Sequence, residues 1–153
     1  MSKPRFDDPD LHTPEHDAIM CWLDENAHES LVAAFGDLDG LVVTSKTWEE
    51  PFKFSGGTRF IDMVIRGRWD RGRFLTEGYV ELACEVKPSI RSVGELVRQL
   101  RQYGGQGEKY GGQERRRVAV VCPDDRAREI IESQGFLFIK APQPDCRSKG
   151  GLF

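Results

Sequence analysis

The hydrophobic pattern changes from helical spacing to strand spacing within the first half of the chain. Segment 13–26 starts with Thr13 and Pro14, an N-cap residue and a residue suited to the first helical position, and carries an apolar stripe that includes Ile19 and Leu23. A second short helix is expected at 28–36. Extended segments rich in β-branched and aromatic residues follow, and they predict three strands at 41–54, 58–67 and 80–87.

The second half alternates helices with strands. Ser92 and Glu95 have the spacing of a capping box at the start of a helix over 89–105, which Gly104 is expected to end. A strand at 115–123, a capped helix at 124–135 and a strand at 136–142 follow. Short links predict that the first three strands form an antiparallel meander, whereas helices between the later strands predict parallel additions. The expected fold class is α/β, with a mixed central sheet flanked by helices.

The length of 153 residues fits one domain with a proper core. We expect a flexible leader at 1–12, a single domain at 13–141 and an irregular tail at 142–153. No apolar run approaches the roughly 20 residues needed to cross a bilayer, and the leader lacks the apolar core of a signal peptide. These features predict a cytoplasmic protein without a membrane partner.

Charge is distributed unevenly along the chain. The formal net charge of -3 gives no overall attraction to nucleic acid. Arginines nevertheless gather in three segments, at 66–73, 91–101 and 115–117. Local basic patches are therefore compatible with this composition.

Three charged residues interrupt the apolar strands: Asp62, Glu85 and Lys87. A carboxylate in such a run costs free energy unless it is solvated, paired or bound to metal. Glu85 and Lys87 are two residues apart, so their side chains leave the same face of a strand. If the strand of Asp62 pairs with theirs, two carboxylates converge beside an ammonium, a set that suits Mg²⁺ and charge on a phosphate. The alternative is an ion pair on a solvated sheet face.

The helix that follows carries polar residues on its apolar side. Gln99 and Tyr103 are four residues apart, on the face of Leu96 and Leu100. A glutamine amide and a half-buried tyrosine hydroxyl need hydrogen-bond partners there. A polar site at the edge of the sheet would supply them, and an amphipathic helix with polar border residues is the alternative.

Asp62, the Glu85-Val86-Lys87 strand end and the spacing Gln99-x-x-x-Tyr103 together resemble the PD-(D/E)xK nuclease superfamily. The last motif is similar to the QxxxY motif of its RecB-type branch. The progression also resembles the nuclease domains of NucS-type mismatch endonucleases and archaeal Holliday-junction resolvases. The resemblance extends over 15–139 and implies a restriction-endonuclease-like αβββαβ core, in agreement with the predicted element order. One departure is that Phe60-Ile61 stands where the family often has Pro or Gly.

The resemblance implies a metal-dependent mechanism for the strand residues. Asp62 and Glu85 would bind Mg²⁺ or Mn²⁺, with the carbonyl of Val86 as a further ligand. Lys87 would orient the attacking water or help to deprotonate it. Bound metal would lower the pKa of that water and neutralise charge on the phosphate.

The helix residues would act around this centre. Gln99 would contact the scissile region or a metal-bound water, and Tyr103 would brace it or touch phosphate in the DNA. No organic cofactor is implied.

The superfamily often adds an acid from the first helix, and Glu15 is the best match. Glu15 is equally well explained as a first-turn acid that complements the helix dipole. Glu49 and Glu50 compete for the same role. His16 is a weaker candidate and is expected to lie at the surface.

Contacts with DNA would come from the basic segments, with Trp69 available for stacking. The candidate arginines are Arg66, Arg68, Arg98 and Arg101. A plain solvated surface explains each of these arginines as well.

Three classes of function remain. The leading one is a metal-dependent DNA endonuclease that acts as a homodimer, either a Holliday-junction resolvase-like enzyme or a repair or mobile-element nuclease. The second is a non-catalytic nucleic-acid-binding module on a nuclease fold, whose signature would be the loss of an Asp, Glu or Lys at these positions, and none is missing here. The third is an unrelated α/β protein with a coincidental charge pair.

Overall fold

The computed structural model describes residues 13–70, 72, 78–104 and 114–144. The predicted leader at 1–12, most of the tail and the glycine-rich segment 105–113 lie outside the described residues. The helices and strands follow in chain order: α1 (Pro14–Glu25), α2 (Ala27–Phe35), β1 (Val42–Phe54), β2 (Gly57–Trp69), β3 (Gly78–Val86), α3 (Val93–Gly104), β4 (Glu114–Cys122), α4 (Arg128–Ser133) and β5 (Leu137–Lys140).

The five strands form one mixed sheet in the order β1-β2-β3-β4-β5. Strands β1, β2 and β3 are antiparallel neighbours, and β4 and β5 are added in parallel. The predicted meander and the predicted parallel additions are both confirmed. The protein therefore has an α/β fold with a five-stranded mixed sheet and flanking helices.

The beginnings of two helices follow the predicted caps, and that of a third does not. The hydroxyl of Thr13 accepts the N–H of His16 at 3.1 Å, and Ser92 Oγ accepts the N–H of Glu95 at 3.3 Å. The helix expected over 124–135 is shorter, because Asp124 binds the side chain and backbone N–H of Arg126 instead of capping a helix there. The prediction of a capped helix start at this point was wrong.

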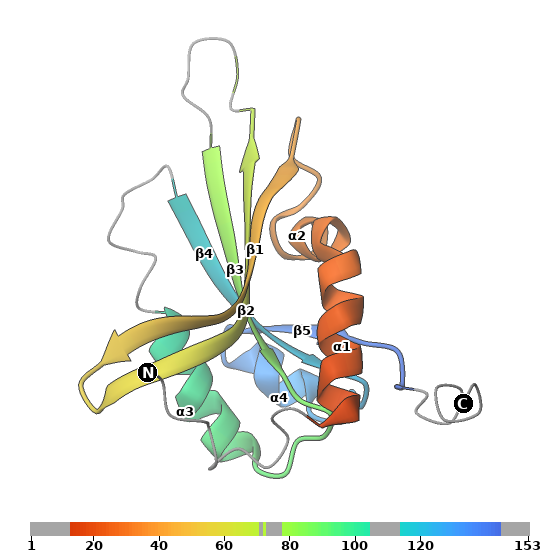
Figure 1. The fold of residues 1–153 in the computed structure, drawn as a ribbon, viewed down its shortest axis with the longest axis vertical. Helices are drawn as coiled ribbons and strands as arrows, with labels where there is room; N and C mark the ends of the chain where they lie inside the picture. Colours follow the sequence, from red (N-terminus) through yellow and green to blue (C-terminus); the bar gives the residue numbers. More distant parts are fainter. Residues whose placement is uncertain (1–12, 71, 73–77, 105–113, 145–153) are drawn as a thin grey trace.

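Helices cover both faces of the sheet, as Figure 1 shows, with α1 and α2 on one side and α3 and α4 on the other. Strand β3 lies at the centre and is buried on both faces. Val80, Leu82, Cys84 and Val86 pack in the cluster with α1 and α2, while Ala83 packs in the cluster with α3 and α4. A polar side chain of β3 that faces α3 is thus enclosed by protein.

The β1–β2 hairpin changes direction near its middle, and its tip extends toward α3 (Figure 1). Glu49 lies in this part of β1 with φ of 52°, and it is the one non-glycine residue with positive φ in the described parts of the chain. Past the bend, Phe52 packs edge-on against the ring of Tyr103 at a centroid distance of 5.0 Å. The hairpin thereby covers one side of α3 and encloses the end of that helix.

Among the described residues, no helix has the length and apolar character that a membrane span requires.

Candidate active site

Asp62 lies where strands β2 and β3 part. Their paired residues run from Trp69 and Gly78 to Met63 and Cys84, and Asp62 is the next residue of β2. Its Oδ2 accepts the backbone N–H of Val86 at 2.8 Å. The Asp62 carboxylate therefore accepts a backbone N–H of β3 just past the last paired residues, and its side chain is fully buried.

Glu85 is the centre of a hydrogen-bonded cluster with α3, and its side chain is also fully buried. The hydroxyl of Tyr103 donates to Oε1 at 2.8 Å, and Gln99 Nε2 donates to Oε2 at 3.1 Å. Gln99 also donates to the Tyr103 hydroxyl at 2.9 Å. The polar partners that the helix pattern required are thus supplied by the carboxylate of the neighbouring strand.

Lys87 reaches the same carboxylate from the protein surface. Its Nζ lies 3.5 Å from Glu85 Oε2, and its side chain is 17% exposed. The backbone N–H of Lys87 donates to the carbonyl of Val121 at 2.9 Å, which fixes the end of β3 against β4. The alternative of an ion pair on an exposed sheet face does not hold, because Glu85 lies entirely inside the protein.

His16 was expected at the surface, and that expectation was wrong. The residue is buried under α1, with Nε2 at 3.6 Å from Asp62 Oδ1 and Nδ1 at 3.9 Å from Asp17 Oδ1. His16 precedes Ile19 and Met20 by three and four residues, so it shares their sheet-facing side of the helix. That spacing was the available signal in the sequence.

The candidate acids differ in their surroundings. Glu15 is exposed in the first turn of α1, and Glu49 is exposed at the bend of β1. Glu50 forms an ion pair of 2.7 Å with Arg66. His16 is a residue of the first helix that the structure brings to Asp62.

Burial and the two carboxylates set the protonation of the groups around them. Burial raises the pKa of the Tyr103 phenol well above its ordinary value, and the charges of Glu85 and Asp62 raise it further. The pKa of the Cys84 thiol is also raised, first by burial and then by the same two carboxylates. Tyr103 consequently remains a hydrogen-bond donor to Glu85 over the physiological range of pH.

The donor chemistry of the cluster fits a hard cation. Within the described ranges, no group of three or more His, Cys, Asp or Glu side chains has the arrangement of a complete metal site. Mg²⁺ usually keeps several waters and needs only one or two protein carboxylates. Asp62 and Glu85 supply carboxylate oxygens, the kind of ligand that Mg²⁺ prefers.

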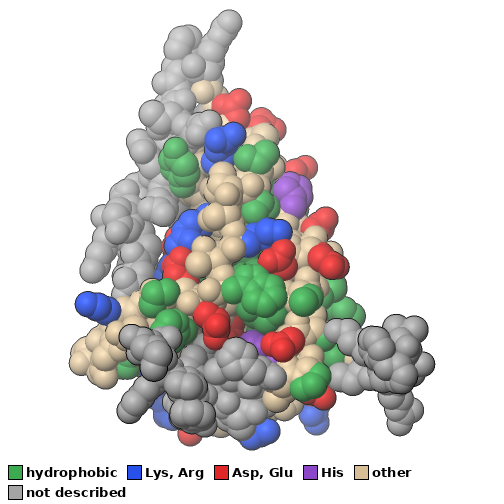
Figure 2. All heavy atoms as spheres, in the orientation of Figure 1, with side chains coloured by type: hydrophobic (Ala, Val, Ile, Leu, Met, Phe, Trp, Pro, Cys, Tyr) green, Lys and Arg blue, Asp and Glu red, His purple; other side chains and the backbone are tan. Residues whose placement is uncertain are grey.

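The proposed DNA-contacting residues fall into different settings. Tyr103 is fully buried, which does not fit the expected contact with DNA, and its hydroxyl accepts a hydrogen bond from Gln99 and donates one to Glu85. Arg66 binds Glu50 and Glu81, and Arg101 donates to Gln134. Arg68 and Arg98 are exposed. The face in Figure 2 shows acidic and basic side chains intermingled, without a patch of one sign.

Comparisons with known proteins give structural likeness at low sequence identity. No protein-family model matches the chain, and no curated protein matches its sequence. A repair endonuclease from Pyrococcus abyssi is similar at 21% identity and a TM-score of 0.45, over 84% of this chain and 47% of that one. EndoMS in complex with double-stranded DNA is similar at 22% identity and a TM-score of 0.45, over 94% of this chain and 50% of that one. An XisH family protein from Nostoc punctiforme is similar at 11% identity and a TM-score of 0.42, over 85% and 91%. The chain spans about half the length of the first two structures.

Proposed function

We propose that the chain is a metal-dependent nuclease that hydrolyses phosphodiester bonds in DNA. The observation that carries this proposal is the pair of fully buried carboxylates, Asp62 and Glu85, at the point where two strands part. Lys87 lies between Glu85 and solvent. Buried charges without such a task are costly, and this cluster joins them to an ammonium group at the surface.

Asp62, Glu85 and the main-chain carbonyl of Val86 would hold Mg²⁺ or Mn²⁺. The Nε2 of His16 lies 3.6 Å from Asp62 Oδ1 and would orient that carboxylate from outside the ligand set. When bound, the cation would supply a water of lowered pKa and positive charge near the phosphate.

The other residues of the cluster orient the reacting groups and stabilise charge. Lys87 Nζ holds the attacking water or a phosphate oxygen at the surface of the cluster, where an ammonium stabilises developing negative charge. Tyr103 and Gln99 each donate to one oxygen of Glu85 and so fix the orientation of its carboxylate. Glu15 stays a candidate for an additional acid at the entrance.

DNA binding is assigned to exposed arginines, of which Arg98 on α3 is adjacent to Gln99 in sequence. Arg68 on β2 is a second exposed candidate. One domain of this size covers little of a duplex, and a homodimer would place two such sites on opposite strands.

The test is a cleavage screen with Mg²⁺ and with Mn²⁺ over single-stranded, duplex, flap, mismatched and four-way DNA. Cleavage of at least one substrate that stops in excess EDTA is expected. Cleavage that persists unchanged in EDTA would refute the metal-dependent mechanism. Absence of cleavage on every substrate with both metals would refute the enzyme.

A non-catalytic DNA-binding module is the second candidate. It is favoured by the hydrogen bonds that protein donors already make to both oxygens of Glu85 and to Oδ2 of Asp62. Such a module would bind DNA with an affinity that Mn²⁺ does not change and would cut none of the substrates. Calorimetric titration with Mn²⁺ separates the two candidates before any substrate is known.

A further inference from the structure

Two consecutive arginines on β4 attach one helix to each face of the sheet. Arg117 Nη1 donates to the carbonyl of Ala34 in the last turn of α2 at 2.6 Å. Arg116 Nη1 donates to the carbonyl of Tyr103 in the last turn of α3 at 2.9 Å. Adjacent strand residues point to opposite faces, and a cation is favourable at a helix C-terminus. The two residues therefore make the same contact with different helices.

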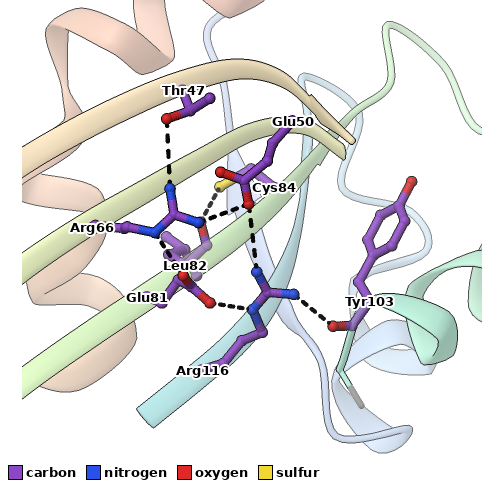
Figure 3. A network of polar contacts seen from close by, with 8 residues as sticks. All are labelled: Thr47, Glu50, Arg66, Glu81, Leu82, Cys84, Tyr103 and Arg116. Atoms are coloured by element: carbon purple, nitrogen blue, oxygen red, sulfur yellow. Dashed lines mark hydrogen bonds and ion pairs between the residues drawn. The ribbon is translucent and has the colours of Figure 1, made fainter. Parts of the chain in front are cut away.

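Arg116 differs from Arg117 in its surroundings. Its side chain is 5% exposed and lies in a network of opposite charges, shown in Figure 3. Nε of Arg116 donates to Glu81 Oε1 at 2.5 Å, and the other oxygen of Glu81 accepts from Arg66 Nε at 2.7 Å. Glu50 Oε2 accepts from Arg66 at 2.7 Å and lies 3.9 Å from Arg116 Nη2. Two carboxylates thus fix the plane of the Arg116 guanidinium.

This network ends on the residue that holds Glu85. Tyr103 receives the Arg116 hydrogen bond at its backbone carbonyl and donates its own hydroxyl to Glu85 Oε1 at 2.8 Å. Arg116 and Glu81 lie on neighbouring strands, and their register pairs the two residues directly. The sheet therefore sets the position of the end of α3, and α3 sets the position of the Glu85 carboxylate.

We propose that Arg116 is a positioning residue that holds Tyr103, and through it Glu85, in the geometry that the candidate active site needs. The inference rests on the proposed nuclease function for its kinetic consequence. Its structural part, that the position of the Tyr103 hydroxyl depends on Arg116, does not rest on the nuclease function.

The test compares Arg116→Lys with Arg117→Lys. Lysine keeps the charge, but a single ammonium cannot replace the planar fork that serves Glu81 and the Tyr103 carbonyl together. In Arg116→Lys, kcat on the DNA that the wild type cuts is expected to fall roughly ten- to a hundredfold with KM unchanged. In Arg117→Lys, kcat is expected to remain that of the wild type.

A second measurement does not depend on cleavage. The chain has three tyrosines, so carbon-13 labelling at tyrosine Cζ gives an NMR spectrum with few signals. The signal that disappears in Tyr103→Phe is that of Tyr103. That signal is expected to shift in Arg116→Lys and to stay in place in Arg117→Lys. If Arg116→Lys does not fold, the double variant Glu81→Gln with Arg116→Met removes both charges together and takes its place.

The outcomes separate the two proposals. A shifted Tyr103 signal in a protein that neither binds Mn²⁺ nor cleaves DNA supports the positioning role and refutes the nuclease. An unmoved Tyr103 signal in a folded Arg116 variant overturns the positioning role, whatever happens to kcat. Equal losses of kcat in the two lysine variants would also overturn it, because they would reflect helix attachment in general.

Discussion

The carboxylate of Asp62 accepts the backbone N–H of Val86 at 2.8 Å, directly past the last paired residues of β2 and β3. Asp62 thus completes the hydrogen bonding of the sheet as well as facing His16. Replacing it would leave a buried N–H without its partner, at a cost of about 1–3 kcal/mol. Loss of activity in an Asp62 variant would therefore mix a folding effect with a catalytic one, and Lys87 offers a cleaner test.

Lys87→Ala is expected to lower cleavage by at least about 100-fold, because it removes the cation that would stabilise charge at the phosphate. Its partner Glu85 keeps the hydrogen bonds from Tyr103 and Gln99. The free energy of unfolding should therefore fall by only about 1–2 kcal/mol, between the values for exposed and buried ion pairs. Initial cleavage rates and urea unfolding measure the two effects.

The matched control for this substitution is Lys140→Ala. Lys140 Nζ lies 3.6 Å from Asp125 Oδ2, and both side chains are about half exposed. This lysine also terminates a strand, so its loss tests the removal of an ion pair at the sheet edge. Wild-type activity in Lys87→Ala would remove Lys87 from the mechanism.

The sequence predicted which polar side chains come together better than it predicted their burial. Asp62, Glu85, Lys87, Gln99 and Tyr103 meet in the structure because strand alternation and the four-residue helical spacing are local rules. Whether a strand face is solvated depends on which helix packs there, and no local rule gives that. Glu85 for this reason fitted a solvated pair as well as a buried one.

The surroundings of two further residues depend on the same kind of packing. His16 looked like a surface residue because the first turn of a helix is usually exposed, yet it is buried with Ile19 and Met20 on the same side of α1. Arg66 stays a proposed DNA contact, and Glu81 and Glu50 bind its side chain from neighbouring strands, which the sequence pattern did not indicate. Both outcomes depend on contacts between residues far apart in the chain.

The second prediction concerns the contribution of His16 and Glu15, in the first turn of α1, to Mn²⁺ binding. His16→Ala is expected to weaken Mn²⁺ binding by about tenfold or more, because its Nε2 lies beside the proposed ligand Asp62. Glu15→Gln, one residue earlier and exposed, is expected to retain the wild-type affinity. Calorimetric titration with Mn²⁺ measures both. The reverse order of effects would make Glu15 a metal ligand and His16 a packing residue.

The salt dependence of DNA binding should differ between a variant of an exposed arginine and a variant of an arginine that is held in ion pairs. Arg98→Ala, on the surface of α3, is expected to weaken DNA binding at all sequences and to reduce the slope of log affinity against log salt by about 1. Arg66→Met is expected to leave that slope unchanged and to lower stability, because Glu50 and Glu81 lose a shared partner. Fluorescence anisotropy at several salt concentrations in EDTA, with urea unfolding, gives both quantities. A reduced slope in Arg66→Met would show that its guanidinium contacts phosphate.

The raised pKa of the Tyr103 phenol predicts that the folded protein loses stability at alkaline pH. Its pKa is raised in the folded protein, by burial first and then by Glu85 and Asp62, while the unfolded chain has a pKa of about 10. Between these values the unfolded state releases a proton that the folded state keeps, so the contribution is complete below about pH 10 and falls as pH rises. The slope from this one group is about 1.4 kcal/mol per pH unit.

Tyr103→Phe should remove this part of the pH dependence. Below pH 10 the variant should be less stable than the wild type by a constant amount, because Glu85 loses a hydrogen bond, and above pH 10 the difference should shrink. The buried Cys84 thiol, whose pKa is also raised, adds a slope of the same sign to both proteins and cancels in the difference. Urea unfolding from pH 8 to pH 11 measures the difference in the free energy of unfolding between the variant and the wild type. Tyr79→Phe, at an exposed tyrosine, is the control. A difference that stays constant through pH 11 would mean that the phenol is accessible to ionisation, and hence that α3 does not enclose Glu85 as the contacts of Gln99 and Tyr103 require.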